Sequence, residues 1–362
     1  MNKDIRVAII GCGKAGHMHA QALRNIEECS LVSASSRSQQ KADEFASAYQ
    51  IKGYVDVQKM IQHEKIDVAV ICTPHPNHTI AVKIMEAGAH VLIEKPLAST
   101  LKDCDAIIKA SEKYNKKAGI VSQRRFFKPS QRVKQAIDDG KIGTPVLGTV
   151  SMLGWRNEAY YKSDPWRGTW KDEGGGVLVN QAPHQLDLFQ WFMNDEIDEL
   201  YGIWKNLNHP YIEVEDTALA IVKFKNGGVG NIIVSNSQKP GIHGKIHIHG
   251  SNGASVGVQT EGGSMFIAGV SSILEPPVND LWSIPNETDN LEKWKKEDTA
   301  FFNTIDPVEY YIRLQNRDFI LAVLNDTKPM VTVKDGRKTV EIFTAIYEST
   351  KINAPVKWPL KN

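Results

Sequence analysis

The first third of the chain alternates short, nearly continuous apolar runs with segments whose apolar residues recur at helical spacing. Runs that are apolar on both faces are typical of parallel strands buried between helices. We predict strands at Ile5–Ile10, Leu31–Ala34, Asp67–Cys72, His90–Ile93 and Ala118–Val121. Helices are predicted after Gly16 and at Lys41–Tyr49, Asp56–His63, Thr79–Ala87 and Leu101–Tyr114. Such alternation predicts a doubly wound parallel sheet, the Rossmann arrangement.

From Pro145 onward the pattern changes to strands that follow one another mostly without helices between them. They are predicted at Val146–Leu153, Glu199–Leu207, Thr217–Phe224, Val229–Ser235 and Lys245–His249. Asn226-Gly227 and Asn252-Gly253 are dipeptides typical of tight hairpin turns. One helix ending near Asp139-Gly140 precedes the strands, and two helices follow them, at Val308–Leu324 and Lys334–Ser349. We expect an α+β domain with a large, mainly antiparallel sheet, in which residues 260–300 form a long loop or arm.

A chain of 362 residues is too long for one small core, so two domains are expected. We predict a dinucleotide-binding Rossmann domain over residues 1–122 and an α+β domain for substrate binding and oligomerisation over residues 123–362. The second face of a wide antiparallel sheet needs a cover, and the strand around Thr217–Val222 is apolar on both sides. We therefore expect a homodimer or a homotetramer.

The composition, with 41% hydrophobic and 23% charged residues, is that of an ordinary soluble globular protein. A net charge of +1 gives no electrostatic case for a nucleic acid or an anionic membrane as partner. No apolar stretch approaches the roughly 20 residues of a membrane span, and Ile5–Ile10 runs into a glycine turn rather than a signal-peptide pattern. The four cysteines have no paired spacing. We expect a cytoplasmic protein with reduced thiols.

Gly11-Cys12-Gly13-Lys14-Ala15-Gly16 follows the first strand directly and matches the pattern G-x-G-x-x-G. The glycines permit a tight turn, the close approach of a pyrophosphate and a tight contact between helix and strand. The helix that follows supplies amide donors and a favourable dipole for the phosphates. The motif therefore predicts a dinucleotide site at Gly11, Gly13, Lys14, Ala15 and Gly16.

An acidic residue that reads the adenosine ribose of NAD is expected about 20 positions beyond these glycines. The sequence at that place is Ser35-Ser36-Arg37-Ser38, with no acid. Hydroxyls and an arginine, here Ser36 and Arg37, can hold a 2′-phosphate, so the sequence admits NADP. Ser38 can equally be the cap of the next helix, and the choice between NAD and NADP stays open.

Lys95 stands between the strand that begins at His90 and Pro96. A residue before proline is pushed toward extended backbone, so the lysine should lie at the carboxyl edge of the sheet, where ligands bind in open α/β folds. A lysine held there can be partly desolvated, which lowers its pKa and suits it to proton chemistry. The alternative is an ordinary surface lysine at a strand end.

Histidines occur in two further patterns. His75 and His78 lie in the loop Thr73-Pro74-His75-Pro76-Asn77-His78, which contains no cysteine or carboxylate, so polar contacts to a cofactor or to a helix start are expected rather than a metal. Alternating residues near the predicted hairpin share one strand face: His243, Lys245, His247 and His249. With a lysine in the row and no carboxylate nearby in sequence, we predict no metal site there either.

A segment from Gly174-Gly175-Gly176 to Asp187 carries the second group of candidate residues. On one helix, Asn180 and His184 would be four residues apart and His184 and Asp187 three apart, so that all three share a face. Pro183 would either kink that helix or stand in its first turn. An imidazole beside an amide and a carboxylate has the composition of an oriented general base, although a histidine on an apolar helix can also be plain core.

Aromatic and arginine residues are interleaved just before the glycines. With no helical or strand period among them, a loop is predicted that contains Trp155, Arg156, Tyr160, Tyr161, Asp164, Trp166, Arg167 and Trp170. Aromatic faces pack on the C–H faces of a pyranose, and arginine and aspartate hold hydroxyls. We interpret the cluster as a sugar-sized site, with packing in the core as the alternative.

Taken together, these motifs resemble the glucose–fructose oxidoreductase / inositol dehydrogenase family (Gfo/Idh/MocA) over the whole chain. The resemblance rests on the glycine turn, the Thr73-Pro74 loop with His78, Glu94-Lys95-Pro96, and the triple glycine followed by His184 and Asp187. It implies a cofactor over the glycine turn, NAD or NADP, whose nicotinamide approaches Lys95 and His184. The segment around Trp155 and Asn180-Gln181 is similar to members that act on pyranosides, levoglucosan and glucoside 3-dehydrogenases among them.

The resemblance also completes the predicted sites. Cofactor contacts are expected from Thr73, His75, His78, Glu94, Lys95, Gln123, Trp166 and Arg167, and substrate contacts from Lys95, Trp155, Arg156, Tyr160, Asn180, His184 and Asp187. Many inositol dehydrogenases of the family carry Asp where this chain has Asn180. A neutral amide can orient a histidine but cannot stabilise its charged form, so Asn180 is expected to bind a substrate hydroxyl instead.

The expected reaction is hydride transfer between a secondary hydroxyl of a sugar or glycoside, such as that at C3, and a nicotinamide cofactor that can stay tightly bound. His184 would be the general base and Lys95 the donor to the reacting oxygen, or Lys95 itself the base. Alternatives within the family are an inositol (cyclitol) dehydrogenase and a keto- or anhydro-sugar reductase. From another class, a dinucleotide-binding sugar sensor without turnover is possible, although the presence of both Lys95 and His184 argues against it.

Overall fold

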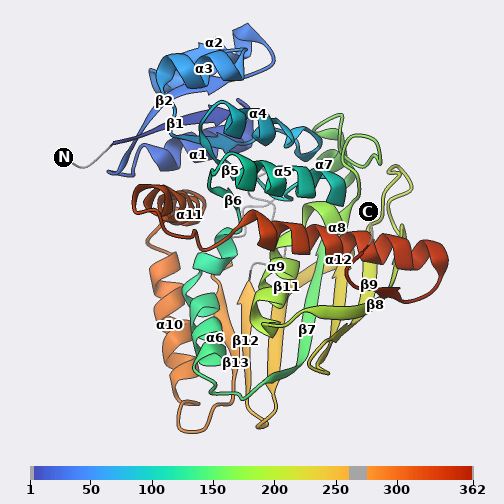
Figure 1. Cartoon of the computed structure of the whole chain (residues 1–362). Helices are drawn as coiled ribbons and strands as arrows, with labels where there is room; N and C mark the ends of the chain where they lie inside the picture. The colour runs from blue at the N-terminus through green and yellow to red at the C-terminus, as the bar shows by residue number, and fades with distance from the viewer. Residues whose placement is uncertain (1–3, 261–274, 361–362) are drawn as a thin grey trace. The chain divides into compact units, whose positions relative to one another are not determined.

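The computed structural model describes residues 4–260 and 275–360 (Figure 1). The chain divides into two compact units, each built from two stretches of sequence. Unit 1 contains Met1–Gln123 and Asp306–Val340, and unit 2 contains Arg124–Ile305 and Glu341–Asn362. That residues 1–122 and 123–362 form two separate functional domains stays a prediction. The packing adds that residues 306–340, late in the sequence, belong with unit 1.

Unit 1 is built around a six-stranded sheet in the order β3-β2-β1-β4-β5-β6, in which every described pair is parallel. This confirms the predicted Rossmann sheet. Its strands are β1 (Ile5–Ile10), β2 (Cys29–Ser35), β3 (Lys52–Tyr54), β4 (Val68–Ile71), β5 (His90–Ile93) and β6 (Ala118–Ile120). Its helices are α1 (Lys14–Leu23), α2 (Gln39–Tyr49), α3 (Val57–Glu64), α4 (Ile80–Glu86), α5 (Leu101–Lys113) and α11 (Pro307–Leu324).

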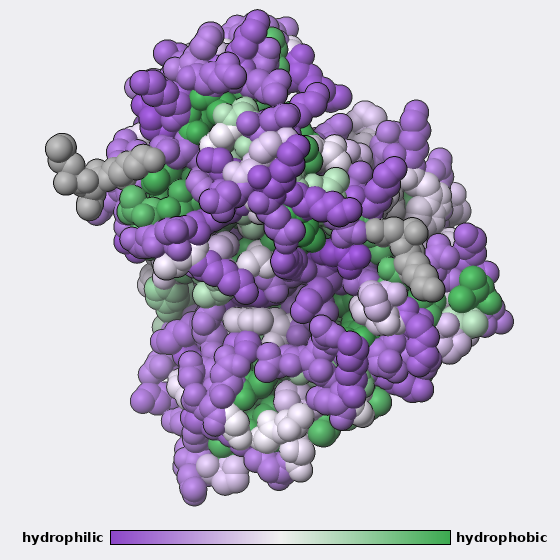
Figure 2. Space-filling model, in the orientation of Figure 1, coloured by the Kyte–Doolittle hydropathy of each residue, from purple (hydrophilic) through white to green (hydrophobic). Residues whose placement is uncertain are grey.

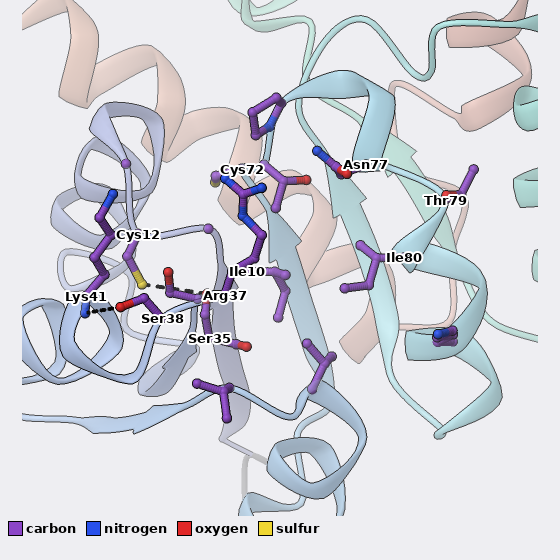
Figure 3. Close-up of a pocket in the computed structure, with 18 residues that line it drawn as sticks. Ile10, Cys12, Ser35, Arg37, Ser38, Lys41, Cys72, Asn77, Thr79 and Ile80 are labelled. Carbon is purple, nitrogen blue, oxygen red and sulfur yellow. Dashed lines mark hydrogen bonds between the residues drawn. The ribbon is translucent and has the colours of Figure 1, made fainter. Parts of the chain in front are cut away.

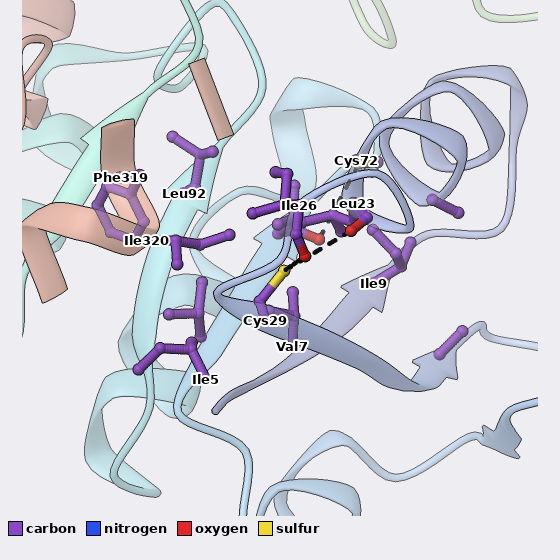
Figure 4. Packing of buried hydrophobic residues seen from close by; sticks show 14 of the residues in the cluster. Ile5, Val7, Ile9, Leu23, Ile26, Cys29, Cys72, Leu92, Phe319 and Ile320 are labelled. Carbon is purple, nitrogen blue, oxygen red and sulfur yellow. Dashed lines mark hydrogen bonds between the residues drawn. The ribbon is translucent and has the colours of Figure 1, made fainter. Parts of the chain in front are cut away.

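The core of unit 1 explains why the strands are almost continuously apolar. Ile5, Val7 and Ile9 of β1 are buried together with residues of α1 and of the neighbouring strands (Figure 4). Phe319 and Ile320 of α11 join the same cluster although they come from the other end of the sequence. The late helix therefore completes the hydrophobic core of the early sheet.

Unit 2 contains an eight-stranded sheet in the order β13-β12-β11-β7-β10-β9-β8-β14, in which β7 and β10 are the one described parallel pair. The expected large, mainly antiparallel sheet is thus confirmed. Its strands are β7 (Pro145–Trp155), β8 (Ile197–Lys205), β9 (Thr217–Phe224), β10 (Val229–Ser235), β11 (Ser237–Gly250), β12 (Ser255–Thr260), β13 (Val278–Trp282) and β14 (Val356–Lys357). Its helices are α6 (Lys128–Asp138), α7 (Glu158–Lys162), α8 (Val177–Asn180), α9 (Pro183–Met193) and α10 (Asn290–Phe302), while α12 (Val333–Ile352) begins in unit 1 and ends in unit 2.

One face of the large sheet is covered by α9, and the other carries exposed apolar side chains. Phe189 of α9 comes so close that a Cβ on Gly148 or Gly230 would lie 2.6 Å from its ring. On alternate positions of β9 and β10, Leu219, Ile221 and Ile233 are exposed. Figure 2 shows a mainly hydrophilic face with hydrophobic residues in separate patches.

Two expectations about elements are wrong. Residues 260–300 are not one long loop, because they include β13 and α10; residues 261–274 of the predicted arm lie outside the described residues. The sequence from Gly176 to Asp187 does not form one helix either. It ends as α8 at Asn180 and starts again as α9 at Pro183. Of the two places predicted for Pro183, the first turn is confirmed, where its missing N–H costs no hydrogen bond.

Candidate functional site

A cavity of about 840 Å³ lies in unit 1 beyond the carboxyl ends of β1, β2 and β4 (Figure 3). Its wall includes Gly11, Gly13, Ser36, Arg37 and Thr73, all five of which the sequence predicted as cofactor contacts. The residues not predicted there include Ser38, Lys41, Pro74, Asn77 and Lys83. The position is the one at which open α/β sheets bind ligands.

Glycine stands at positions 11, 13 and 16 of the motif for different physical reasons. Gly11 has φ of +107°, and a Cβ there would lie 2.9 Å from the backbone of Cys72 and Thr73; a Cβ on Gly16 would lie 2.2 Å from the Gly11 carbonyl oxygen. These two are required by the fold of the turn. A Cβ on Gly13 would meet no atom within 4 Å, so the chain leaves open space there in which a ligand can approach the backbone. Gly13 precedes α1, whose first turn also contains Lys14 and Ala15.

The charge of the cavity wall suits a phosphate-containing ligand. Arg37, Lys41 and Lys83 line it, and no described lining residue is a carboxylate. The Ser38 side chain accepts a hydrogen bond from the Lys41 backbone N–H at 3.5 Å and caps α2, the alternative role foreseen for it. Ser36 and Arg37 stand beside it at the end of β2, where the sequence predicted the reader of the ribose.

Two predicted cofactor residues carry buried polar atoms that find no partner among the described residues. They are Thr73 Oγ1 and Gln123 Oε1. A buried polar atom without a hydrogen bond costs about 1–3 kcal/mol, so such atoms are expected where a ligand completes the contacts. Thr73 lines the cavity, so its hydroxyl, together with Gly13 and the cations, fits a dinucleotide there.

His75 and His78 do not line the cavity; instead His78 organises the loop that does. The His78 ring is fully buried, with Nε2 2.8 Å from the Thr73 carbonyl oxygen and Nδ1 3.0 Å from that of Pro96. Burial lowers the pKa of His78, against the raising effect of the carbonyl oxygens around the ring and of the charge of Glu94. The imidazole thereby ties the loop after β4 to the segment just after Lys95.

Lys95 is held by a network that sequence reasoning missed. It follows β5, and its backbone N–H donates to Glu94 Oε2 at 3.0 Å. Glu94 Oε1 lies 3.0 Å from Nε2 of the fully buried His19 in α1, and His19 Nδ1 lies 3.0 Å from Asn316 Oδ1 in α11. Burial raises the pKa of Glu94, but the hydrogen bond and charge of His19 and the charge of Lys95 outweigh it, so the pKa is lowered overall. Glu94 is therefore an ionised anchor for Lys95.

In unit 2, the predicted substrate residues Tyr160 and Asn180 meet at one oxygen. Three N–H donors lie within hydrogen-bond distance of the Tyr160 hydroxyl oxygen and share it as acceptor: Asn180 Nδ2 at 3.1 Å, Gln181 Nε2 at 2.9 Å and Arg167 Nη1 at 2.5 Å. Burial raises the pKa of Tyr160 to about 12, so the phenol stays protonated at neutral pH. Arg167 also stacks on the rings of Tyr160 and Trp166, 4.3 and 4.4 Å from their centroids.

His184 stands in the first turn of α9 and is partly exposed. Asp187 is buried on the same helix, where its two oxygens accept from Arg125 Nε at 2.8 Å and Nη2 at 2.7 Å. The Asp187 carboxylate is thus held by a bidentate ion pair inside unit 2, which suits a structural role. Lys95 belongs to unit 1 and His184 to unit 2, so each is described within its own unit.

The other aromatic residues form a ring cluster. Trp155 is partly exposed at the end of β7 and lies 5.0 Å from the His209 ring, and Tyr161 lies 5.4 Å from the same ring. His209 is fully buried, with Nδ1 2.7 Å from Asp216 Oδ2 and Nε2 2.7 Å from the Arg156 carbonyl oxygen. The expected loop is interrupted by the short helix α7, which contains Tyr160 and Tyr161. These two side chains are buried, whereas Trp155 and Trp170 are exposed.

Glu215, which nothing in the sequence analysis singled out, anchors the triple glycine. Its carboxylate accepts from the N–H groups of Gly176 and Leu178 at 2.9 Å and from the Tyr347 hydroxyl at 3.0 Å. A Cβ on Gly176 would lie 1.9 Å from the Glu215 carbonyl oxygen, which explains that glycine. Burial raises the pKa of Glu215 to about 7, against the lowering effect of these hydrogen bonds.

The predicted histidine row is organised around a carboxylate from another strand. Lys245 Nζ and His247 Nε2 lie 3.0 and 2.9 Å from Asp280 Oδ2, and His249 Nδ1 lies 2.8 Å from Ser255 Oγ. The side chain of His243 lies outside those described. Within residues 4–260 and 275–360, no group of three or more His, Cys, Asp or Glu side chains is arranged to hold a metal ion. None of the described helices is both long and apolar enough to cross a membrane.

A parallel sheet with a glycine turn and a cationic cavity is the arrangement of a dinucleotide-binding unit, and here it stands in one chain with a large mixed sheet. Family models agree: residues 5–121 match the oxidoreductase family with NAD-binding Rossmann fold, and residues 130–256 match the GFO/IDH/MocA C-terminal domain. The chain belongs to the Gfo/Idh/MocA oxidoreductase family.

Similar proteins extend over the whole chain. The scyllo-inositol 2-dehydrogenase (NAD(+)) of Bacillus subtilis is 26% identical over 100% of this chain and 98% of its own. The WlbA dehydrogenase of Bordetella pertussis, solved in complex with NADH and UDP-GlcNAcA, is 26% identical with a TM-score of 0.85, covering 100% and 99% of the two chains. The myo-inositol 2-dehydrogenase of Lactobacillus plantarum is 25% identical with a TM-score of 0.76, covering 98% and 99%.

Proposed function

We propose that this protein is a nicotinamide-dependent dehydrogenase that transfers hydride between a secondary hydroxyl of a sugar or glycoside and the cofactor. The observation that carries the proposal is the cavity of unit 1. Its glycine turn, its three cations and the buried polar atom of Thr73 suit a dinucleotide. Lys95 follows the neighbouring strand β5, and its backbone N–H donates a hydrogen bond to the Glu94 carboxylate.

The chain's own residues have distinct tasks in this proposal. Gly11, Gly13 and Arg37 would hold the dinucleotide, which when bound accepts or donates the hydride. His184 would take the hydroxyl proton, because the pKa of an unperturbed imidazole lies near neutrality. Lys95 would donate a hydrogen bond to the same oxygen and stabilise the charge that develops on it. Glu94 accepts a hydrogen bond from the Lys95 backbone N–H and so fixes the backbone at this residue.

The identity of the alcohol is the finer part of the proposal. The partly exposed Trp155, and Tyr160 with Asn180, provide aromatic and hydrogen-bonding surface of the kind that suits a pyranose. The resemblance to levoglucosan and glucoside 3-dehydrogenases makes a pyranoside the first candidate substrate. The similar inositol dehydrogenases favour a cyclitol as the second candidate, and WlbA, solved with UDP-GlcNAcA, favours a nucleotide-linked sugar as the third.

One screen separates these candidates and the non-enzymatic alternative. The purified protein is incubated with NAD or NADP and, in turn, with glucosides, levoglucosan, inositols and UDP-sugars, while absorbance of the reduced nicotinamide is recorded. Reverse reactions use the reduced cofactors with keto- and anhydro-sugars. Reduction of the cofactor by one class supports the dehydrogenase, and turnover only in the reverse direction favours a reductase. A dinucleotide that binds but never changes its redox state would favour the sugar sensor.

The preferred dinucleotide is a second part of the proposal. The family model of unit 1 is that of an NAD-binding fold, and the similar WlbA was solved with NADH. In this chain, however, Arg37 and Lys41 line the cavity near Ser36, and no described carboxylate does. A carboxylate at that place would repel a 2′-phosphate, so we propose that NADP is accepted besides NAD.

A further inference from the structure

Glu173 is the feature of unit 2 that neither the sequence motifs nor the proposed reaction explains. The side chain is buried, with only 1% of its surface exposed. Glu173 Oε2 accepts from the Gly168 N–H at 2.6 Å, and Oε1 lies 2.5 Å from Asn180 Nδ2. A carboxylate placed so close to a predicted substrate residue affects how that residue meets a ligand.

Two contacts of Asn180 indicate which way its amide points. A side-chain amide has two N–H donors on one side and an oxygen acceptor on the other. Here the nitrogen meets two acceptors, Glu173 Oε1 at 2.5 Å and the Tyr160 hydroxyl at 3.1 Å. The reversed amide would set its oxygen against the buried Glu173 carboxylate, which only accepts, and this is unfavourable. The nitrogen is thus directed inward, and a group on the other side of Asn180 meets an acceptor.

We propose that Glu173 is a positioning residue that fixes the Asn180 amide in this orientation and so makes Asn180 a hydrogen-bond acceptor toward the substrate. This inference rests on the proposed function, because it assigns Asn180 to the substrate site. It narrows the substrate, since the group beside Asn180 must be a donor, such as a sugar hydroxyl. It also explains why an amide stands at position 180: a carboxylate there would face Glu173 at hydrogen-bond distance.

Exchange of the two groups tests the proposal. Asn180→Asp puts a second carboxylate, on a partly exposed residue, against the buried Glu173, which disfavours the ionisation of both at once. We expect the catalytic efficiency kcat/KM for the sugar to fall about 10- to 100-fold, with the dissociation constant of the dinucleotide unchanged. When Glu173→Gln is combined with Asn180→Asp, the introduced glutamine can still accept from the Gly168 N–H and can donate to the new carboxylate. The double variant should recover to within about threefold of the wild type, far above the product of the two single effects.

Two measurements keep the test independent of the reaction. Urea unfolding of the wild type, the two single variants and the double variant gives a double-mutant cycle in the free energy of unfolding. The contact is thus tested even if no substrate is turned over. Glu196→Gln removes an exposed partner of Lys225 in the same unit and controls for the loss of one negative charge. If the wild type turns over no sugar or cyclitol, the proposed function fails while the stability cycle still tests the contact. Single effects that simply add in both the rate and the stability cycle would overturn the role of Glu173.

Discussion

The protonation of Glu215 should make the stability of the protein depend on pH in a particular way. The Glu215 carboxyl is fully buried, and its pKa is raised from about 4.5 to about 7. The folded state therefore binds this proton more tightly than the unfolded state, and its contribution is fully present below pH 4.5. It is lost as the pH rises toward 7 and beyond. A shift of this size corresponds to roughly 3 kcal/mol of stability, at 1.36 kcal/mol per pH unit.

The variant Glu215→Gln removes this titration while it keeps an acceptor for the N–H groups of Gly176 and Leu178. The free energy of unfolding is measured by urea titration at half-unit steps from pH 4 to pH 9 for both proteins. We expect the advantage of the wild type over the variant to shrink by about 3 kcal/mol across that range. The exposed Glu196→Gln should instead follow the wild-type curve with constant offset. Parallel curves for the wild type and Glu215→Gln would refute the reasoning.

Four other predictions concern the proposed reaction and assembly. Lys95→Met should leave dinucleotide binding intact and lower turnover by about two orders of magnitude or more; near-native turnover would refute its role. The oxidation rate should rise with pH through one ionisation in the neutral-to-alkaline range, and His184→Ala should remove it; a profile that survives in this variant but disappears in Lys95→Met would make the lysine the base. Ser36→Asp should raise the ratio of the NADP to the NAD dissociation constant about tenfold, and an unchanged ratio would mean that this turn does not read the ribose. Because Leu219, Ile221 and Ile233 expose apolar surface on one sheet face, sedimentation at micromolar concentration should show a dimer or tetramer, and a species of monomer mass alone would contradict this.

The parts of the site that lie next to their own motif could be predicted from the sequence. The glycine turn, the end of β2 and the Thr73 loop each follow a strand, and parallel strands bring their carboxyl ends to one edge. The long-range partners could not. His19, Glu94 and Asn316 come together from α1, the end of β5 and α11, and no spacing in the sequence indicates that meeting.

The sequence pattern was weakest where polar groups are buried. The spacing of residues predicts one helix through Asn180 and His184, but α8 ends at Asn180. The Asn180 side chain there forms hydrogen bonds with Tyr160 and Glu173. Glu215 and Asp216 look in the sequence like two ordinary acids before a strand. Each instead binds backbone N–H groups of a separate turn, Glu215 at Gly176 and Asp216 at Leu207. A buried carboxylate is recognised by its donors, which only the fold brings near.

The division of unit 1 into two stretches of sequence affects the order in which the chain can fold during synthesis. Residues 124–305 leave the ribosome before α11, whose Phe319 and Ile320 complete the core of the first sheet and whose Gln315 accepts from the Ser122 N–H at 2.8 Å. Burial of two such side chains contributes about 3–6 kcal/mol. Until that helix is made, the early sheet has an open apolar surface of the kind that chaperones bind. A fragment that ends at residue 122 should for the same reason be aggregation-prone, whereas one in which residues 306–340 are joined to it by a short linker should be soluble.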